Sequence, residues 1–224
     1  MLYNVNVDEW GTTYVPTALG NALIVVAIVA MLLIASIVAK KQTEITKKKF
    51  SVKQLVFCAM AIALGTVLSE LKLVSFPYGG SITILSMLII CLPGYWFGLS
   101  AGLMTACAYG TLQILFDPYI IHPIQMLLDY TLAFGALGLS GVFANSKNGL
   151  IKGYILGTFG RYVCSTISGY VFFAEYAWEG WGALAYSVVY NAIVIYPEVI
   201  VTIIILLIPA MKKAMVTGKN MALN

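Results

Sequence analysis

Long apolar stretches with almost no charged residues dominate this chain. The first runs from about Val15 to Ala39, where Lys40 and Lys41 end it. An α-helix rises about 1.5 Å per residue, so about 20 apolar residues cross the hydrocarbon core of a bilayer. Only 10% of the 224 residues are charged, whereas roughly a quarter are charged in a soluble domain. We therefore expect an integral membrane protein.

Seven stretches are predicted as transmembrane helices, which gives an all-α fold. Polar segments, one Pro-Gly pair, one Asp-Pro pair and one basic linker separate them. A break at Pro93-Gly94 is expected to end the short third helix. The first ten residues hold Asp8 and Glu9 but no basic residue, so we expect a retained first helix and not a signal peptide. The approximate bounds are Val15–Ala39, Leu55–Leu71, Ile82–Leu92, Tyr95–Phe116, Pro123–Phe143, Leu150–Phe173 and Leu184–Met211.

The distribution of charge predicts an orientation in the membrane. Six of the thirteen Lys and Arg residues lie between Lys40 and Lys53. If that segment is cytoplasmic, eleven basic residues fall on its side of the membrane: these six, Lys147, Lys152, Lys212, Lys213 and Lys219. Cytoplasmic loops of membrane proteins are enriched in Lys and Arg. The N-terminus is therefore expected outside and the C-terminus inside.

Three ionisable residues remain within the predicted spans: Asp129, Arg161 and Glu198. A charge is unfavourable in hydrocarbon, so each is a candidate functional residue. The alternative is a structural ion pair between helices, for which Arg161 and Glu198 are the best partners. The sequence alone leaves both interpretations of Glu198 open.

One face of the sixth predicted helix has the character of a pocket wall. Arg161, Ser165, Gly169 and Phe173 recur every four residues and so share one helical face. A cation, a hydroxyl, a gap and an aromatic ring in succession favour a pocket, although ordinary helix packing would also use such a stripe.

The segment that follows Phe173 is rich in aromatic residues. An interfacial aromatic belt explains Trp178 and Trp181 as well as a binding role does. Tyr186 and Asn191, in contrast, enter the next helix. Aromatic faces beside the buried carboxylate of Asp129 favour an organic cation with flat rings, which gains from both the ring quadrupoles and the negative charge.

Motifs for other classes of chemistry are missing from the sequence. It holds no Ser/His/Asp set, no HExxH and no glycine-rich phosphate loop, so we expect neither an enzyme nor a resident cofactor. The single histidine, His122, and four scattered cysteines give no metal-binding spacing, and we expect the cysteines to be small buried residues.

Two longer segments resemble a known family. The runs YGTLQILFDPYIIHPIQMLLDYTLAFGALGLSG (109–141) and SGYVFFAEYAWEG with YSVVYN (168–191) are similar to the thiamine-specific substrate-binding (S) components of energy-coupling factor (ECF) transporters, the ThiT/YuaJ family. The resemblance covers about residues 52–212. It implies a six-helix S-component bundle in residues 51–224, with residues 1–50 as an extra N-terminal helix and basic linker.

The resemblance also implies a function and partners. A member of this family binds thiamine at the outer face of a Gram-positive cell membrane. It then docks on one transmembrane coupling protein and two cytoplasmic ATPases, and it carries the ligand inward when ATP is hydrolysed. Alanines spaced AxxxA contact the coupling protein in the family, and here Ala59 and Ala63 fit that pattern.

By position, the resemblance carries over a set of ligand-binding residues and a lid around Tyr78. Asp129 stands where some relatives have Glu, Phe173 where Trp occurs, and Ser165 where His occurs. The implied thiamine-binding residues are Asp129, Tyr130, Tyr119, Arg161, Ser165, Gly169, Phe173, Tyr186 and Asn191.

Three alternatives to a thiamine-binding subunit stay open. The first is an S component for a related vitamin or for the hydroxymethyl aminopyrimidine precursor of thiamine, which lacks the cation. The second is a self-sufficient secondary transporter, although the sequence contains no recognisable inverted repeat. A membrane-embedded enzyme is the third, and the scarcity of acid–base residues makes it the least favoured.

Overall fold

The structure is a computed structural model that describes residues 3–8, 11–19, 22, 51–76, 80–116 and 119–224. Most of the first predicted span and Tyr78 lie outside these residues. The helices are α2 (Val52–Glu70), α3 (Ser86–Phe97), α4 (Leu99–Phe116), α5 (Pro123–Met126), the π-helix η1 (Leu127–Leu132), α6 (Ala133–Gly135), the 3-10 helix η2 (Ala136–Phe143), α7 (Gly149–Phe172), the 3-10 turn η3 (Ala174–Tyr176), α8 (Ala183–Leu207) and α9 (Pro209–Leu223).

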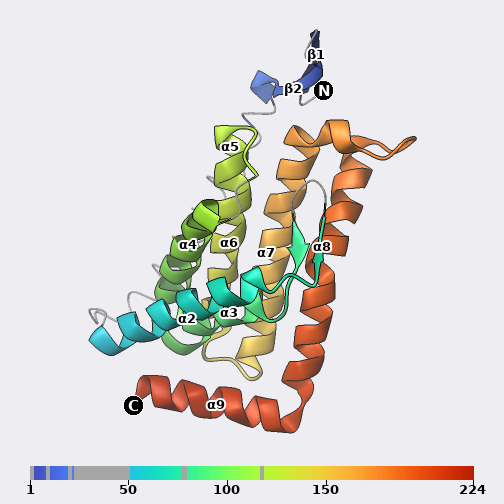
Figure 1. Cartoon of the computed structure of the whole chain (residues 1–224). Coiled ribbons are helices and arrows are strands. Elements are labelled where there is room, and N and C mark those ends of the chain that lie inside the picture. Colours follow the sequence, from blue (N-terminus) through green and yellow to red (C-terminus); the bar gives the residue numbers. More distant parts are fainter. Residues whose placement is uncertain (1–2, 9–10, 20–21, 23–50, 77–79, 117–118) are drawn as a thin grey trace.

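The arrangement of helices agrees with a helical membrane protein. Four segments of the described chain are long and apolar enough to cross a bilayer: α2, α4, the continuous helical run Pro123–Phe143 and α8. The helix α3 is apolar but shorter, and α7, with 24 residues, carries Lys152 and Arg161. Figure 1 shows α4, α6 and α7 side by side, with α2 crossing in front of them.

Two antiparallel hairpins depart from the predicted all-α fold. The first pairs β1 (Tyr3–Asp8) with β2 (Gly11–Pro16), and the second pairs β3 (Val74–Ser75) with β4 (Ser81–Ile82). The predicted start of the third helix at Ile82 is therefore wrong. Ile82 is a strand residue, and α3 begins only after Leu85, whose φ of 59° is incompatible with a continuing right-handed helix.

The predicted break at Pro93-Gly94 is also wrong, because α3 continues through both residues to Phe97. Proline removes one backbone hydrogen bond, and in membrane helices neighbouring segments compensate for such a loss. The helix η2 packs closely against this part of α3, since a Cβ at Gly94 would lie 2.8 Å from the backbone nitrogen of Gly141. Tertiary packing thus holds the helix together where the local sequence predicts an end.

The last predicted span divides into two helices. The helix α8 ends at Leu207, Ile208 is extended with φ −64° and ψ 124°, and Pro209 begins α9. A residue before proline disfavours helical geometry, which explains the division. In Figure 1, α9 turns away from α8 and runs across the base of the bundle. The prediction of one span to Met211 is corrected accordingly.

Small residues allow the central helices to approach closely. A Cβ at Gly102 of α4 would lie 2.6 Å from the carbonyl oxygen of Gly138 in η2. The buried core beside this contact includes Ile90, Leu137 and Tyr154. The helices α3, α4, η2 and α7 pack closely together. A cavity therefore lies on the other side of α7, which faces α8 and η1.

Candidate ligand-binding site

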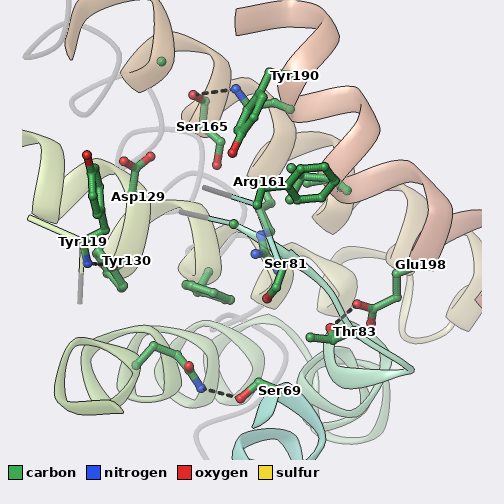
Figure 2. A pocket seen from close by; sticks show the side chains of 18 of the residues that line it. Ser69, Ser81, Thr83, Tyr119, Asp129, Tyr130, Arg161, Ser165, Tyr190 and Glu198 are labelled. Carbon is green, nitrogen blue, oxygen red and sulfur yellow. Dashed lines mark hydrogen bonds between the residues drawn. The ribbon is translucent and has the colours of Figure 1, made fainter. Parts of the chain in front are cut away.

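A cavity of about 380 Å³ lies between α2, the β3–β4 hairpin, α4, the segment α5–η1, α7 and α8. Figure 2 shows this cavity from close by. Every residue that the sequence analysis assigned to the ligand lines it: Tyr119, Asp129, Tyr130, Arg161, Ser165, Gly169, Phe173, Tyr186 and Asn191. The alanines Ala59 and Ala63 lie elsewhere, exposed on α2.

Asp129 sits in the π-helix η1 and is held by neutral donors. Its Oδ2 accepts hydrogen bonds from Gln125 Nε2 at 2.7 Å and from Ser168 Oγ at 2.8 Å. Among the described residues, no side chain or backbone group donates to Oδ1. The carboxylate is thus fixed in direction while one oxygen stays available to a ligand. Short π-helical segments often occur at functional sites.

Gln125 is a positioning residue that the sequence analysis missed. Its side chain is 1% exposed, and besides Asp129 its Nε2 donates to the Tyr119 carbonyl oxygen at 3.1 Å. Its Oε1 accepts from the Ile121 amide at 3.3 Å. Gln125 therefore ties the loop before α5 to the carboxylate. The signal in the sequence was its position one turn before Asp129, where i, i+4 side chains meet.

One aromatic wall of the cavity comes from the loop before α5 and the end of α7. The rings of Tyr119 and Phe173 stack with centroids 5.9 Å apart and planes at 28°. The Tyr130 hydroxyl accepts from the Tyr119 amide at 2.7 Å, and the hydroxyls of Tyr119 and Tyr176 are 3.0 Å apart. This last hydrogen bond is the main reason why the pKa of Tyr176 is raised, and the Tyr176 phenol therefore stays neutral.

A second aromatic wall comes from α8. Tyr186 is 3% exposed, and its ring centroid is 5.4 Å from that of Tyr190. Phe76 of the β3–β4 hairpin packs edge-on against Tyr190 at 5.8 Å. Trp178 contacts Tyr186 from outside and is 42% exposed, which fits its interpretation as an interfacial residue.

Asn191 and Gly169 join the two helices that frame the cavity. The Asn191 Nδ2 donates to the carbonyl oxygens of Ser187 at 2.9 Å and Ser165 at 3.2 Å. Asn191 lines the cavity, and its Oδ1 accepts no hydrogen bond from the described residues. A Cβ at Gly169 would collide with Ser187 Oγ, so the glycine serves close packing of α7 on α8 as well as lining the cavity.

The suggested ion pair between Arg161 and Glu198 is not formed. The Arg161 guanidinium lies 4.1 Å from the centroid of the Phe134 ring and has no hydrogen-bond or salt-bridge partner in the part of the chain that the structure describes. Glu198 is 4% exposed and accepts instead from Thr83, Ser86 and the Met87 amide. Figure 2 shows Arg161 between Asp129 and Glu198.

The charges that line the cavity favour a cationic ligand. Among the described residues, three carboxylates and two cations line the cavity, which leaves a formal charge of −1 when all are ionised: Glu70, Asp129 and Glu198 against Lys72 and Arg161. A single positive charge on a ligand would balance them. Flat rings would fit between the two aromatic walls, where stacking adds to the electrostatic attraction.

Comparisons with known proteins agree with this geometry. The model of the family described as "Thiamine transporter protein (Thia_YuaJ)" matches residues 55–217. The thiamine transporter ThiT of Bacillus subtilis is 36% identical in an alignment of 146 residues, and the match covers 59% of this chain and 76% of that protein. ThiT of Lacticaseibacillus paracasei is 29% identical in an alignment of 123 residues, and the match covers 49% of this chain and 59% of that protein.

A solved structure gives the same result for the fold. The structure of ThiT from Listeria monocytogenes superimposes with a TM-score of 0.59 at 29% sequence identity, and the match covers 68% of this chain and 90% of that one. All of these relatives are named as transporters or as ThiT, and none as an enzyme. The family model matches well over half of the sequence, and the chain therefore belongs to the thiamine transporter family.

Proposed function

We propose that this protein is the high-affinity thiamine-binding subunit of an ECF-type importer. The observation that carries the proposal is the carboxylate of Asp129, which keeps one oxygen open in a cavity of about 380 Å³. Aromatic residues flank the cavity on two sides, and its formal charge suits a monocation. Thiamine combines a cationic thiazolium with a flat aminopyrimidine, and the family is named for its transport.

The proposed binding mode gives each wall a role. Asp129 balances the thiazolium charge or holds the aminopyrimidine, and the rings of Tyr130, Phe173 and Tyr186 stack on the ligand. The Asn191 Oδ1 accepts a hydrogen bond from the amino group on the pyrimidine. Arg161, which lacks a protein hydrogen-bond partner among the described residues, lies near the hydroxyethyl end and donates to its oxygen.

Transport requires partners in this proposal. A coupling protein docks on α2 at Ala59 and Ala63, which are exposed, and two cytoplasmic ATPases supply the energy. The window of α2 is the least buried of the four candidate spans, as expected for a helix that offers a face to lipid or to a partner. The proposal includes seven spans, an outer N-terminus and an inner C-terminus.

Isothermal titration of the detergent-purified protein with thiamine tests the proposal. We expect tight one-to-one binding, and we expect hydroxymethyl aminopyrimidine, which lacks the cation, to bind far more weakly. Equal affinity for the precursor would shift the assignment to a precursor-binding subunit. Native mass spectrometry of the protein as purified should also detect co-purified thiamine.

A second experiment separates the proposal from a self-sufficient transporter. Proteoliposomes that hold only this chain should bind thiamine without accumulating it. Uptake driven by an ion gradient in those proteoliposomes would contradict the role as a subunit.

A further inference from the structure

Glu198 is a second buried carboxylate in the cavity, and the proposed binding mode gives it no role. Its Oε2 accepts from Thr83 Oγ1 at 2.5 Å, and its Oε1 accepts from the Met87 amide at 2.9 Å. Ser86 Oγ lies 3.3 Å from both carboxylate oxygens and 2.7 Å from Thr83 Oγ1. A buried charge is stable only when donors surround it in this way.

All of these donors belong to one short segment, the junction between β4 and α3. Thr83 directly follows β4, and Ser86 and Met87 are the first residues of α3. Leu85 between them adopts φ 59°. The carboxylate thus fixes the end of the β3–β4 hairpin on α8. Figure 2 shows Glu198 and Thr83 joined at this point.

The same face of α8 meets the hairpin at two further points. Tyr190, Val194 and Glu198 recur every four residues and so form one stripe along the helix. Phe76 packs on the Tyr190 ring at 5.8 Å. Gly80, with φ +85°, lies so close to Val194 that a Cβ on it would be 3.2 Å from a Val194 methyl group. The contact at Glu198 is polar and charge-assisted, whereas the Phe76 ring and Gly80 make apolar contacts with α8.

We propose that Glu198 is a positioning residue that anchors the β3–β4 hairpin on α8 and thereby sets how fast ligand enters and leaves the cavity. The inference rests on the proposed function of thiamine binding. Phe76, Gly80 and Ser81 of the hairpin line the cavity, so separation of the hairpin from α8 opens that wall. Charge-assisted hydrogen bonds are about twice as strong as neutral ones, and their loss raises the open fraction.

Stopped-flow measurement of thiamine binding by tryptophan fluorescence tests the anchor. Glu198→Met removes every acceptor at similar side-chain length, and Thr83→Val removes the 2.5 Å donor at equal size. We expect each variant to raise both the association and the dissociation rate constants of thiamine about tenfold, the change that roughly 1.4 kcal/mol produces. Glu198→Gln keeps an acceptor for the Met87 amide, so its rate constants should lie between those of the wild type and Glu198→Met. The double variant Glu198→Met/Thr83→Val should have rate constants close to those of either single variant.

The matched control is Thr202→Val, which also exchanges a hydroxyl for a methyl group. Thr202 is fully buried on α8 one turn beyond Glu198 and is not among the residues that line the cavity. It should leave both rate constants unchanged. Damage to the fold alone would lower the binding-competent fraction without raising the association rate constant. An unchanged or reduced association rate constant in Glu198→Met and Thr83→Val would overturn the inference.

Hydrogen–deuterium exchange of the ligand-free protein tests the anchor independently of thiamine. The amides of Leu73 and Phe76 donate within the hairpin, to Ile82 O at 2.8 Å and Gly80 O at 3.0 Å. In Glu198→Met these amides should exchange faster while α4 and α7 keep their protection. Uniformly faster exchange in both anchor variants would overturn the inference. If the wild type binds no thiamine but the hairpin amides still exchange faster in Glu198→Met, the proposed function is wrong while the anchoring role of Glu198 is supported.

Discussion

At the scale of single residues, the site depends on a carboxylate that the protein orients without neutralising. The two groups that donate to Asp129, Gln125 and Ser168, are both uncharged. Arg161 lines the same cavity but packs on Phe134 and forms no salt bridge with Asp129. A protein cation in direct contact would satisfy this charge without any ligand. Neutral donors leave that charge to the ligand.

The first prediction concerns this charge. Asp129→Asn keeps the size of the side chain and removes the charge, so thiamine affinity should fall by about 100-fold, roughly 2.7 kcal/mol, as expected for loss of a charge-assisted contact. Titration calorimetry measures the dissociation constant. An unaltered melting temperature would show that the fold survives, and an unaltered dissociation constant would remove the physical basis of the ligand assignment.

The second prediction concerns the aromatic wall. Phe173→Ala removes the ring that stacks on Tyr119, and affinity for thiamine should fall at least tenfold because aromatic contacts add about 0.5–1.5 kcal/mol to the buried area that is also lost. Phe173→Trp is the matched control, since it preserves a flat face, and it should bind thiamine nearly as well as the wild type. Equal affinity of both variants would show that this ring does not contact the ligand.

Several cavity-lining residues were predictable from the sequence, whereas their supports were less so. Charge within an apolar span identified Asp129 and Arg161, and four-residue spacing identified the α7 face. Gln125 lies one turn before Asp129, which was a local signal that went unused, whereas Ser168 is 39 positions away and its role appears only from the three-dimensional contact. The partners of Glu198 were equally hidden, because Thr83 lies 115 positions away in the chain.

At the scale of elements, the frame of the cavity depends on how closely α7 and α8 approach. The third prediction is that Gly169→Ala weakens thiamine binding at least tenfold, because a Cβ there collides with Ser187 Oγ and would lie 3.2 Å from Asn191 Nδ2, which disturbs the α8 side chains that line the cavity. Gly182→Ala is the control, since a Cβ at Gly182 meets nothing within 4 Å. Calorimetric titration measures the thiamine affinity of both variants. Equal affinity of Gly169→Ala and Gly182→Ala would show that α7 and α8 can adjust to the added methyl group.

The fourth prediction concerns the outer face of α2. Ala59→Trp should leave thiamine binding intact and abolish uptake in cells, because a large ring blocks close approach of the coupling protein. Leu115→Trp places the same ring on α4 at a side chain that is 77% exposed, and it should transport normally. Normal uptake by the Ala59 variant would remove the docking assignment.

Element boundaries show where local sequence rules fail. The predicted bounds of α2, α4 and the run Pro123–Phe143 lie within a few residues of those in the structure, because apolar composition governs long spans. The β3–β4 hairpin and the continuation of α3 through Pro93 were missed. Both depend on contacts with distant segments: Phe76 with Tyr190, and Gly94 with Gly141. Apolar patterning carries no information about such contacts.

At the scale of the whole molecule, the cavity is built from the part of the chain that the family shares. Its lining residues run from Ser69 to Glu198, and the family match covers residues 55–217. The N-terminal hairpin lies outside that match, although β2 contacts α7 and η3. The helix η3 holds Tyr176, whose hydroxyl meets that of Tyr119 in the aromatic wall.

The fifth prediction therefore separates the N-terminal region from ligand binding. A variant that lacks residues 1–50 retains all the described residues that line the cavity, so its dissociation constant for thiamine should stay within about threefold of the wild type, less than about 1 kcal/mol. Titration of the purified variant measures this. If affinity falls further, the contact of β2 with η3 stabilises the wall that holds Tyr119, and the binding unit would then extend beyond the six-helix region. The substitution Tyr176→Phe removes the hydroxyl contact with Tyr119 but leaves β2 in place. If the truncation weakens binding by disturbing η3, Tyr176→Phe should lower thiamine affinity in the same way.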